Sequence, residues 1–197
     1  MATLMTRVDV GGARKLRWTY EAVRDAVSRG TLDPETRYEI LEGELYEKVG
    51  QDWPHSFAIR ALVKAFGALD PSEFDVFSQS PLRVGDDMPE PDVAIVKGPY
   101  TDRTTHPSAS DAVLVVEVAD SSIGCDRLVK SRIYAIGGVP VYWIVDLNGN
   151  QVEVYARPEA GRYLDRTVYG VGDVLLPPFD RAPTVAVRDL IAPPRQP

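Results

Sequence analysis

Two carboxylates and one amine, those of Asp92, Glu117 and Lys130, have the chemistry needed to work together on a phosphate ester. Two carboxylates can hold a divalent cation, which polarises a phosphodiester and lowers the pKa of a bound water. A nearby ammonium can position that water or stabilise the charge that develops on the phosphate. These residue types predict a metal-dependent active site, with Asp92 and Glu117 as metal ligands and all three as catalytic residues.

Glu117 carries most of this interpretation. It lies inside the apolar run of residues 112–120, between Val116 and Val118. A charge is costly to bury there unless it is paired or holds a metal, and ordinary buried strands of α/β proteins carry none. Asp92 stands at the start of a second apolar run, directly after Pro91.

Asp92 and Lys130 also have a purely structural interpretation. Asp92 would simply begin a strand after Pro91, and Lys130 would be an exposed helix partner of Asp126, four residues earlier. Such a helix pair contributes only about 0.3–0.5 kcal/mol. Taken singly, these two residues favour the structural interpretation, whereas Glu117 favours a functional one.

The composition limits the class of protein. With 197 residues, 44% of them apolar and 26% charged, the chain fits one soluble domain with a sizeable core. No window is long and apolar enough to span a bilayer, and the N-terminus lacks the apolar segment of a signal peptide. We therefore expect a cytoplasmic protein with no membrane partner, and the single cysteine, Cys125, suits a reducing compartment.

Ligand types and net charge narrow the chemistry further. Two histidines, His55 and His106, and one cysteine argue against a zinc site built from several Cys and His ligands. The plentiful acids suit Mg²⁺ or Mn²⁺. The net charge of −7 argues against loose, counterion-driven attachment to nucleic acid. It leaves room for a nucleic-acid enzyme whose basic residues gather around one groove.

Periodicity and turn signals predict the order of the elements. We expect helices over 19–29, 54–69 and 125–136, a β-hairpin over 37–49, and strands over 74–84, 91–97, 112–119, 139–146, 151–155 and 162–169. The passage from Glu117 to Asp146 predicts a strand–helix–strand crossover, while the earlier strands follow short turns. The fold class is therefore α/β, or α+β, with one mixed sheet flanked by helices.

The domain organisation is simple. No internal repeat and no boundary interrupts the chain. Residues 1–17 are interpreted as a flexible N-terminal arm, residues 18–190 as a single domain and residues 191–197 as a C-terminal tail. The proline-rich stretch after Pro177 is expected to cover the core.

Several segments of the chain, taken together, resemble the Uma2 family of restriction-endonuclease-like proteins. They are Arg37 to Leu45, Pro91-Asp92, Val115 to Val118, Asp126-Arg127 with Lys130 and Tyr134, and Gly138 to Asp146. The resemblance extends over about residues 35–170. That family is assigned to the PD-(D/E)xK nuclease superfamily, so the resemblance implies a restriction-endonuclease-like core.

By this resemblance Asp92 would be the motif aspartate and Glu117 the second metal ligand. The chain departs from the superfamily pattern at one point, because the lysine two positions after the second acid falls at Ala119. Lys130 is then the candidate for a lysine supplied by the following helix, since its stem is long and flexible.

Two accessory residues are predicted at lower weight. Of the two hairpin acids, Glu42 and Glu44, Glu42 is preferred as one that could reach the metal, although turn carboxylates are usually solvated. His55 resembles a family position and could contact phosphate or act as a base, although a histidine at a helix start more often closes the helix end.

Other polar residues of the same region are expected to be structural. Asp126 would favour the helix dipole, and Tyr134 would pack in the core or orient Lys130. Ser121 and Ser122 lack the flanking pattern of a nucleophile, and no phosphate-binding glycine loop is present.

The leading functional hypothesis is a Mg²⁺- or Mn²⁺-dependent endonuclease that hydrolyses DNA. The alternative is a non-catalytic nuclease-fold module that binds nucleic acid or a protein partner. A third hypothesis is an enzyme that uses the same metal chemistry on another phosphate ester or nucleotide. Nuclease folds often pair to cut two strands, so a homodimer is compatible with the first.

Overall fold

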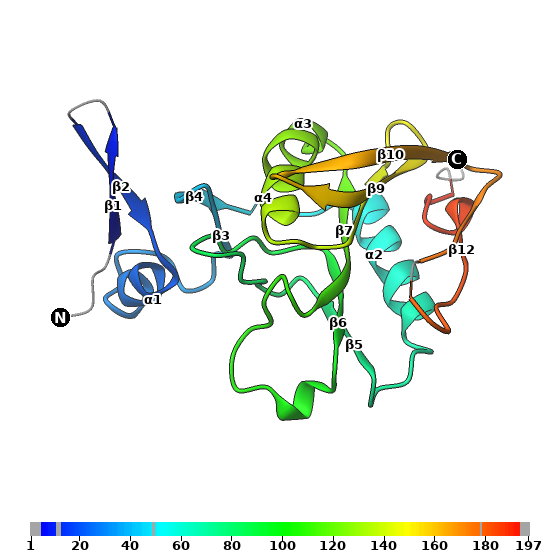
Figure 1. Ribbon diagram of the computed structural model, residues 1–197, viewed down its shortest axis with the longest axis horizontal. Coiled ribbons are helices and arrows are strands. Elements are labelled where there is room, and N and C mark those ends of the chain that lie inside the picture. Colours follow the sequence, from blue (N-terminus) through cyan, green and yellow to red (C-terminus); the bar gives the residue numbers. More distant parts are fainter. Residues whose placement is uncertain (1–4, 11–12, 49, 178, 194–197) are drawn as a thin grey trace.

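The computed structural model describes residues 5–10, 13–48, 50–177 and 179–193 (Figure 1). These residues form a six-stranded sheet in the order β10-β9-β8-β7-β6-β5. Its strands are β5 (Phe74–Ser78), β6 (Val93–Lys97), β7 (Ala112–Ala119), β8 (Val141–Asp146), β9 (Gln151–Glu159) and β10 (Arg162–Gly170). Neighbouring strands are antiparallel except β7 and β8, which are parallel. The predicted mixed sheet is confirmed.

The two parallel strands are joined by the predicted crossover, but its helix is not uniform. It consists of α3 (Ile123–Cys125), a π-helical turn (Asp126–Lys130) and α4 (Ser131–Ile136). In the π turn the N–H of Ser131 donates to the carbonyl of Asp126, five residues earlier. A π turn holds one more residue than an α turn and is frequent at functional sites. The prediction of an unbroken helix over 125–136 is therefore corrected here.

The sheet separates two apolar clusters, because side chains of a strand alternate between its faces. Val116 and Val118 of β7 pack in the cluster beneath α2 (Trp53–Phe66). Val115 and Ala119 pack in the other cluster, with Tyr134 of α4. Figure 1 shows α2 and α4 on opposite sides of β7. Every residue of β7 is buried, as expected of a central strand.

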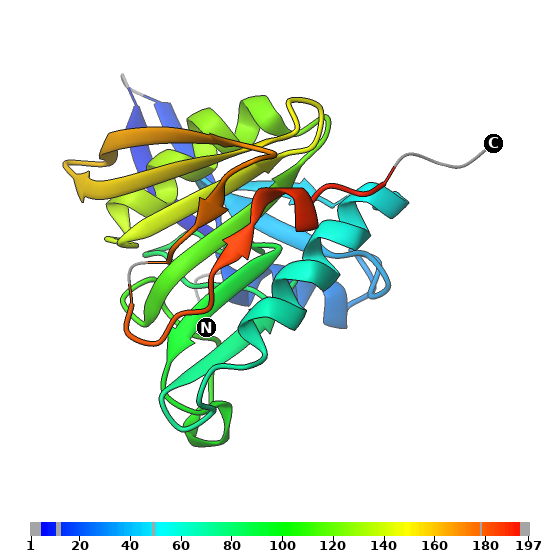
Figure 2. The same ribbon diagram turned by 90° about the vertical axis from the view of Figure 1, so that its right-hand side faces the viewer.

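The C-terminal segment, residues 174–177 and 179–191, covers the core as predicted, and it does so on the same face as α2. After β11 (Val174–Leu175), the chain passes through β12 (Val185–Ala186) and a 3₁₀ turn (Val187–Asp189). Four of its side chains enter the core: Leu175, Val185, Val187 and Leu190. Figure 2 shows this red segment beside α2. In the described part of the chain, no helix has the length and apolarity to cross a bilayer.

Only some of the apolar side chains of helix α2 are fully buried. Ala58, Ile59, Leu62 and Phe66 are buried, whereas Phe57, Ala61 and Ala65 face a groove described below. Its first turn is capped by Asp52, whose side chain accepts a hydrogen bond from the His55 N–H at 3.2 Å. The cap fixes where His55 enters the helix.

The described part of the N-terminal arm predicted over residues 1–17 contains two strands. Strands β1 (Met5–Val10) and β2 (Ala13–Trp18) pair antiparallel, and α1 (Tyr20–Ser28) follows with Thr19 as its N-cap. A Gly-Gly pair between two alternating runs is a hairpin signal, and the prediction of a loose arm overlooked it. The hairpin predicted over residues 37–49 is confirmed as β3 (Tyr38–Leu41) and β4 (Glu44–Glu47). Its turn residues, Glu42 and Gly43, have φ values of 53° and 74°, which favour glycine and tight hairpins.

Candidate active site

The three residues predicted to act together do meet in one cavity. This cavity has a volume of about 290 Å³ and lies at the end of β7, and we call it the acid pocket. Its walls include Glu39, Lys48, Gln51, Asp52, His55, Asp92, Glu117, Asp120, Ser121, Ser122, Cys125, Asp126 and Lys130. The sheet supplies Asp92 and Glu117, and the crossover helix supplies Lys130.

Glu117 is held on the α4 side of the sheet by two donors. Its Oε1 accepts a hydrogen bond from Lys130 Nζ at 3.0 Å and another from the Tyr134 hydroxyl at 2.7 Å. The side chain is 2% exposed. Burial raises the pKa of Glu117 to about 8, and the charges of Asp92 and Asp126 add to the effect of burial while Lys130 opposes it. Glu117 therefore retains a proton near neutral pH when no cation is bound.

Asp92 has the opposite protonation preference. Its Oδ2 accepts a hydrogen bond from the Val118 N–H at 2.8 Å and lies 3.2 Å from His55 Nε2. Burial alone would raise the pKa of Asp92, but the hydrogen bond from His55 and the charge of Lys48 outweigh burial and lower it. The pocket thus pairs an ionised carboxylate with a protonated one.

Lys130 is buried among acids rather than exposed on the helix. Its Nζ lies 3.0 Å from Glu117 Oε1, 3.2 Å from Glu39 Oε2 and 3.9 Å from Asp126 Oδ1. Burial disfavours its charge, yet the surrounding carboxylates raise the pKa of Lys130 above its ordinary value. Lys130 is 5% exposed and Asp126 is 2% exposed, so the interpretation as an exposed helix pair is wrong. Both residues belong to the π turn, and both are buried.

Two further charged residues of the acid pocket were missed from the sequence. Glu39 of β3 contacts Lys130 and also accepts a hydrogen bond from the Glu90 N–H at 3.2 Å. Lys48, which follows β4, donates to the Glu90 carbonyl at 2.8 Å and lies 3.9 Å from Asp92 Oδ1. The one signal in the sequence was the alternation of the hairpin, which places Glu39 on the same face as the apolar Leu41.

The two predicted accessory residues have different outcomes. His55 lies in the acid pocket against Asp92, as described above. Glu42 does not line the acid pocket and instead forms an ion pair with Arg132 on the surface. A hairpin turn points its side chains away from the docked strand, so the acid that reaches Lys130 is Glu39. Glu42 is accordingly replaced by Glu39 as the hairpin's contribution.

The residues expected to be structural are more involved than predicted. Tyr134 is buried in the core, but its hydroxyl binds Glu117 rather than Lys130. Ser122 donates to Asp126 Oδ2 at 2.6 Å, which is a supporting contact. Asp126 is buried, and burial raises its pKa, so it is not a solvated charge at a helix start.

The acid pocket offers carboxylate oxygens, the ligand type that hard divalent cations prefer. Among the described residues, no group of three or more His, Cys, Asp and Glu side chains is arranged as a ligand set. Mg²⁺ is commonly bound through one or two carboxylates, with waters and substrate phosphate completing its shell. Asp92 and Glu117 could supply two such carboxylates, and Glu117 Oε2 accepts no hydrogen bond from any described residue.

Comparisons with known proteins agree with this architecture. The solved structure of a protein from Anabaena variabilis ATCC 29413, titled a "putative nuclease belonging to DUF820", is 18% identical, with a TM-score of 0.66. The match covers 81% of this chain and 92% of that one, and it shows a shared fold. None of the curated proteins matches the chain. The model of the Uma2 family, described as "Putative restriction endonuclease", matches residues 24–184, so the chain belongs to the Uma2 family.

Proposed function

We propose that this chain is a Mg²⁺- or Mn²⁺-dependent endonuclease that hydrolyses phosphodiester bonds of DNA. The observation that carries the proposal is the meeting of Asp92, Glu117 and the buried Lys130 ammonium in the acid pocket. Membership of a family described as restriction endonuclease supports the choice of DNA as substrate.

Asp92 and Glu117 would hold the cation in this proposal. When bound, a divalent cation polarises the phosphodiester and lowers the pKa of a water. The protein keeps both carboxylates in place through their donors, which are the Val118 N–H and His55 for Asp92 and the Tyr134 hydroxyl for Glu117. Such supporting hydrogen bonds orient ligands and tune their basicity.

Lys130 supplies positive charge rather than a base. Its raised pKa keeps the amine protonated throughout the working range of pH. In that state the ammonium can hold Glu117 in position and stabilise charge that develops on a phosphate. The lysine missing at position 119 is thereby replaced by one from the crossover helix.

The excess of acids makes the proposed DNA contact depend on the cation. The described lining of the acid pocket has two lysines, Lys48 and Lys130, against seven acids: Glu39, Glu47, Asp52, Asp92, Glu117, Asp120 and Asp126. Without a divalent cation, ionised carboxylates repel a phosphate. We therefore expect DNA to enter the acid pocket only with the metal.

The test is a cleavage assay with purified protein, plasmid DNA and Mn²⁺. Glu117→Gln should reduce the rate by about 100-fold or more, because a lost electrostatic contact in an active site typically costs that much. The matched control is Glu153→Gln, a second buried glutamate outside the acid pocket, which should cleave normally per folded molecule. Equal cleavage by the Glu117→Gln variant and the unmodified protein would show that the activity lies elsewhere.

The absence of a three-residue ligand set among the described residues favours a second candidate, a non-catalytic nuclease-fold module. Calorimetric titration with Mn²⁺ distinguishes the two candidates. The endonuclease should bind the ion, and Asp92→Asn should abolish that binding. A module without the site should release no heat that depends on Asp92.

The cleavage products distinguish between the possible substrates and test whether the protein acts as a homodimer. Cleavage of a small phosphodiester but not of plasmid DNA would indicate another phosphate ester as the substrate. A duplex cut on both strands in one encounter needs two acid pockets, and a homodimer would supply them. Linear plasmid formed without a nicked intermediate would support the homodimer.

A further inference from the structure

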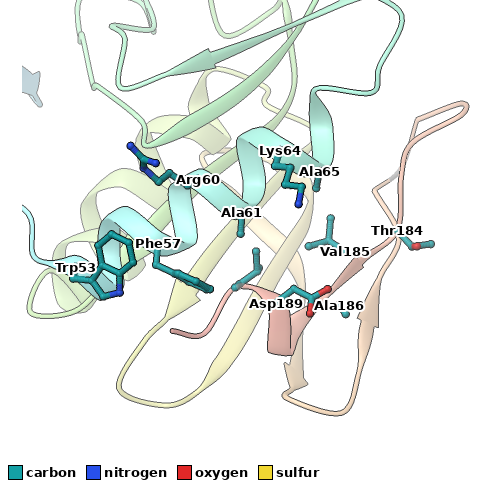
Figure 3. Close-up of a pocket in the computed structure, with 11 residues that line it drawn as sticks. Trp53, Phe57, Arg60, Ala61, Lys64, Ala65, Thr184, Val185, Ala186 and Asp189 are labelled. Carbon is teal, nitrogen blue, oxygen red and sulfur yellow. The ribbon is translucent and has the colours of Figure 1, made fainter. Parts of the chain in front are cut away.

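A second and larger cavity lies outside the acid pocket, between α2 and the C-terminal segment (Figure 3). Its volume is about 580 Å³, and we call it the α2 groove. Its lining is Trp53, Phe57, Arg60, Ala61, Lys64 and Ala65 from the helix, with Thr184, Val185, Ala186, Asp189 and Leu190 from the C-terminal segment. The groove has an apolar floor and charged side chains along its rim.

The rim of the groove on α2 is a stripe of aromatic and basic residues. Trp53, Phe57, Arg60 and Lys64 are spaced by four, three and four residues, which places them on one face of the helix. Trp53 is 56% exposed although it is a large apolar side chain. In the described part of the chain, neither Arg60 nor Lys64 forms an ion pair or a side-chain hydrogen bond. Both cations are exposed and open to an anionic ligand.

The α2 groove and the acid pocket share no lining residue among those described, but both involve the first turn of α2. Trp53 stands between Asp52 and His55 in the first turn of α2, and both of these neighbours line the acid pocket. Figure 3 shows Trp53 and Phe57 at that end of the helix, with Arg60 and Lys64 farther along it. A strand that passes from the acid pocket around the first turn of α2 would meet the aromatic residues first and the cations next.

We propose that the α2 groove binds a single-stranded stretch of the DNA substrate, with phosphates on Arg60 and Lys64 and a base against Trp53. This inference rests on the proposed nuclease function. Grooves that bind single strands combine cations that follow the backbone with aromatic side chains on which bases stack. The α2 groove has both features in one stripe.

Charge disfavours the alternative that a second copy of the chain fills the groove. A two-fold contact sets the same patch against itself, so Arg60 and Lys64 would face their own copies. Asp189 is the acid among the lining residues, and its ion-pair partner is the neighbouring Arg188 at 3.8 Å. Phosphate is the better complement to the two cations.

The test is fluorescence anisotropy of a labelled single-stranded oligonucleotide with the full chain in EDTA, which separates binding from cleavage. Arg60→Ala/Lys64→Ala should weaken binding roughly ten-fold and reduce the slope of log K against log salt by about 1.4, or about 0.7 per phosphate contact. The matched control is Arg157→Ala/Arg162→Ala, which removes the same charge near the far end of the β9–β10 hairpin and should bind normally.

Trp53 provides an independent test. Trp53→Ala should lose about five-fold or more in affinity, whereas Trp53→Phe should retain most of it, because the aromatic face is what stacks. Since Trp53 is exposed, both variants should unfold at the same temperature as the unmodified protein. Unchanged affinity and salt slope in Arg60→Ala/Lys64→Ala and in Trp53→Ala would overturn the inference.

The two proposals fail in different ways. If no DNA is cleaved with Mn²⁺ but the stripe variants lose oligonucleotide binding, the groove is upheld and the endonuclease proposal fails. If DNA is cleaved and the stripe variants bind and cleave like the unmodified protein, the groove inference is wrong and the endonuclease stands. If Trp53→Ala changes the sedimenting mass but not the DNA affinity, the groove is a self-association surface and the inference is again overturned.

Discussion

Glu117 and Glu153 make an instructive pair because they share nearly everything except their protonation. Each lies between two valines of its strand, and both pair in register with Ile144 of the strand between them. They are 2% and 0% exposed. Nevertheless, the pKa of Glu117 is raised to about 8, whereas that of Glu153 is lowered to about 2.

The number of donors for each carboxylate explains the difference. Burial would raise the pKa of Glu153, but it accepts hydrogen bonds from Arg166 at 3.1 Å, from Arg127 at 3.0 Å and from the Tyr155 hydroxyl at 2.6 Å. Glu117 has one cationic donor, Lys130, which also serves Glu39 and Asp126. Glu153 therefore has several donors, whereas Glu117 shares its cationic donor with two other acids.

This comparison corrects the reason for suspecting Glu117. A charge between two valines of a strand would have nominated Glu153 equally, and Glu153 forms structural ion pairs with two arginines. What distinguishes a candidate ligand is an acid whose charge its neighbours leave unbalanced, so that a cation can still stabilise it.

The largest expected effect is a difference in stability between variants of Lys130, which contacts Glu117, and of Arg127, which contacts Glu153. Lys130→Met should lower the free energy of unfolding by about 3–5 kcal/mol, because it leaves buried acids without their ammonium. Arg127→Met should cost much less, since Arg166 still contacts Glu153 and Arg127 is 37% exposed. Urea denaturation at pH 7 measures both. Equal losses in the two variants would mean that the clusters are equivalent.

Next comes the pH dependence of cation binding. Glu117 must lose its proton to act as a ligand, so Mn²⁺ affinity should rise by about ten-fold per pH unit from pH 6 towards pH 8 and then level off. The same raised pKa means that, without metal, Glu117 lowers the stability of the fold as the pH rises from about 4.5 to about 8. Calorimetric titrations at several pH values should show one proton released per ion. A pH-independent affinity would exclude Glu117 as a ligand.

Glu153 should show the opposite trend with pH. Its lowered pKa contributes stability that is present above about pH 4.5 and is lost as the pH falls towards 2. Glu153→Gln should therefore cost about 2 kcal/mol at pH 7 and less in acid. Thermal unfolding between pH 3 and pH 7 measures the difference. A constant cost over that range would show that the pKa of Glu153 is not lowered in the folded protein.

The smallest expected effect concerns the second donor of Glu117. Tyr134→Phe removes a hydrogen bond to its carboxylate and should cost about 1 kcal/mol of stability. Because that donor favours the charged form, its loss should raise the pKa of Glu117 further and shift the pH profile of Mn²⁺ binding upward. Tyr155→Phe is the matched change beside Glu153 and should leave Mn²⁺ binding unaltered.

The sequence predicted those parts of the site that lie on continuous buried elements. Glu117 and Asp92 adjoin long apolar runs, and β7 was predicted with the bounds it has. Glu39 and Lys48 were missed because they reach the pocket through a tertiary contact. The β3–β4 hairpin docks when Ile40 and Met88 exchange backbone hydrogen bonds of 2.9 and 3.1 Å, and no local pattern reveals that pairing.

The π turn was equally beyond a local prediction. The residues from Asp126 to Lys130 have ordinary helical propensities. The extra residue in the turn follows from a backbone hydrogen bond that spans five residues instead of four. The α2 groove was hidden for a related reason. Phe57, Ala61 and Ala65 have core-like spacing, but the C-terminal segment packs beside them instead of on top of them.

The π turn also makes the position of the amine independent of the position of the carboxylates. The crossover carries the amine, and the sheet carries the carboxylates. A one-residue deletion between Asp126 and Lys130 would therefore rotate the part of the helix that carries the amine. It would turn the amine by about 100° about the helix axis while the carboxylates stayed where they are. We therefore expect that a change in the length of this short stretch removes or restores the arrangement of the amine and the carboxylates while the fold stays the same.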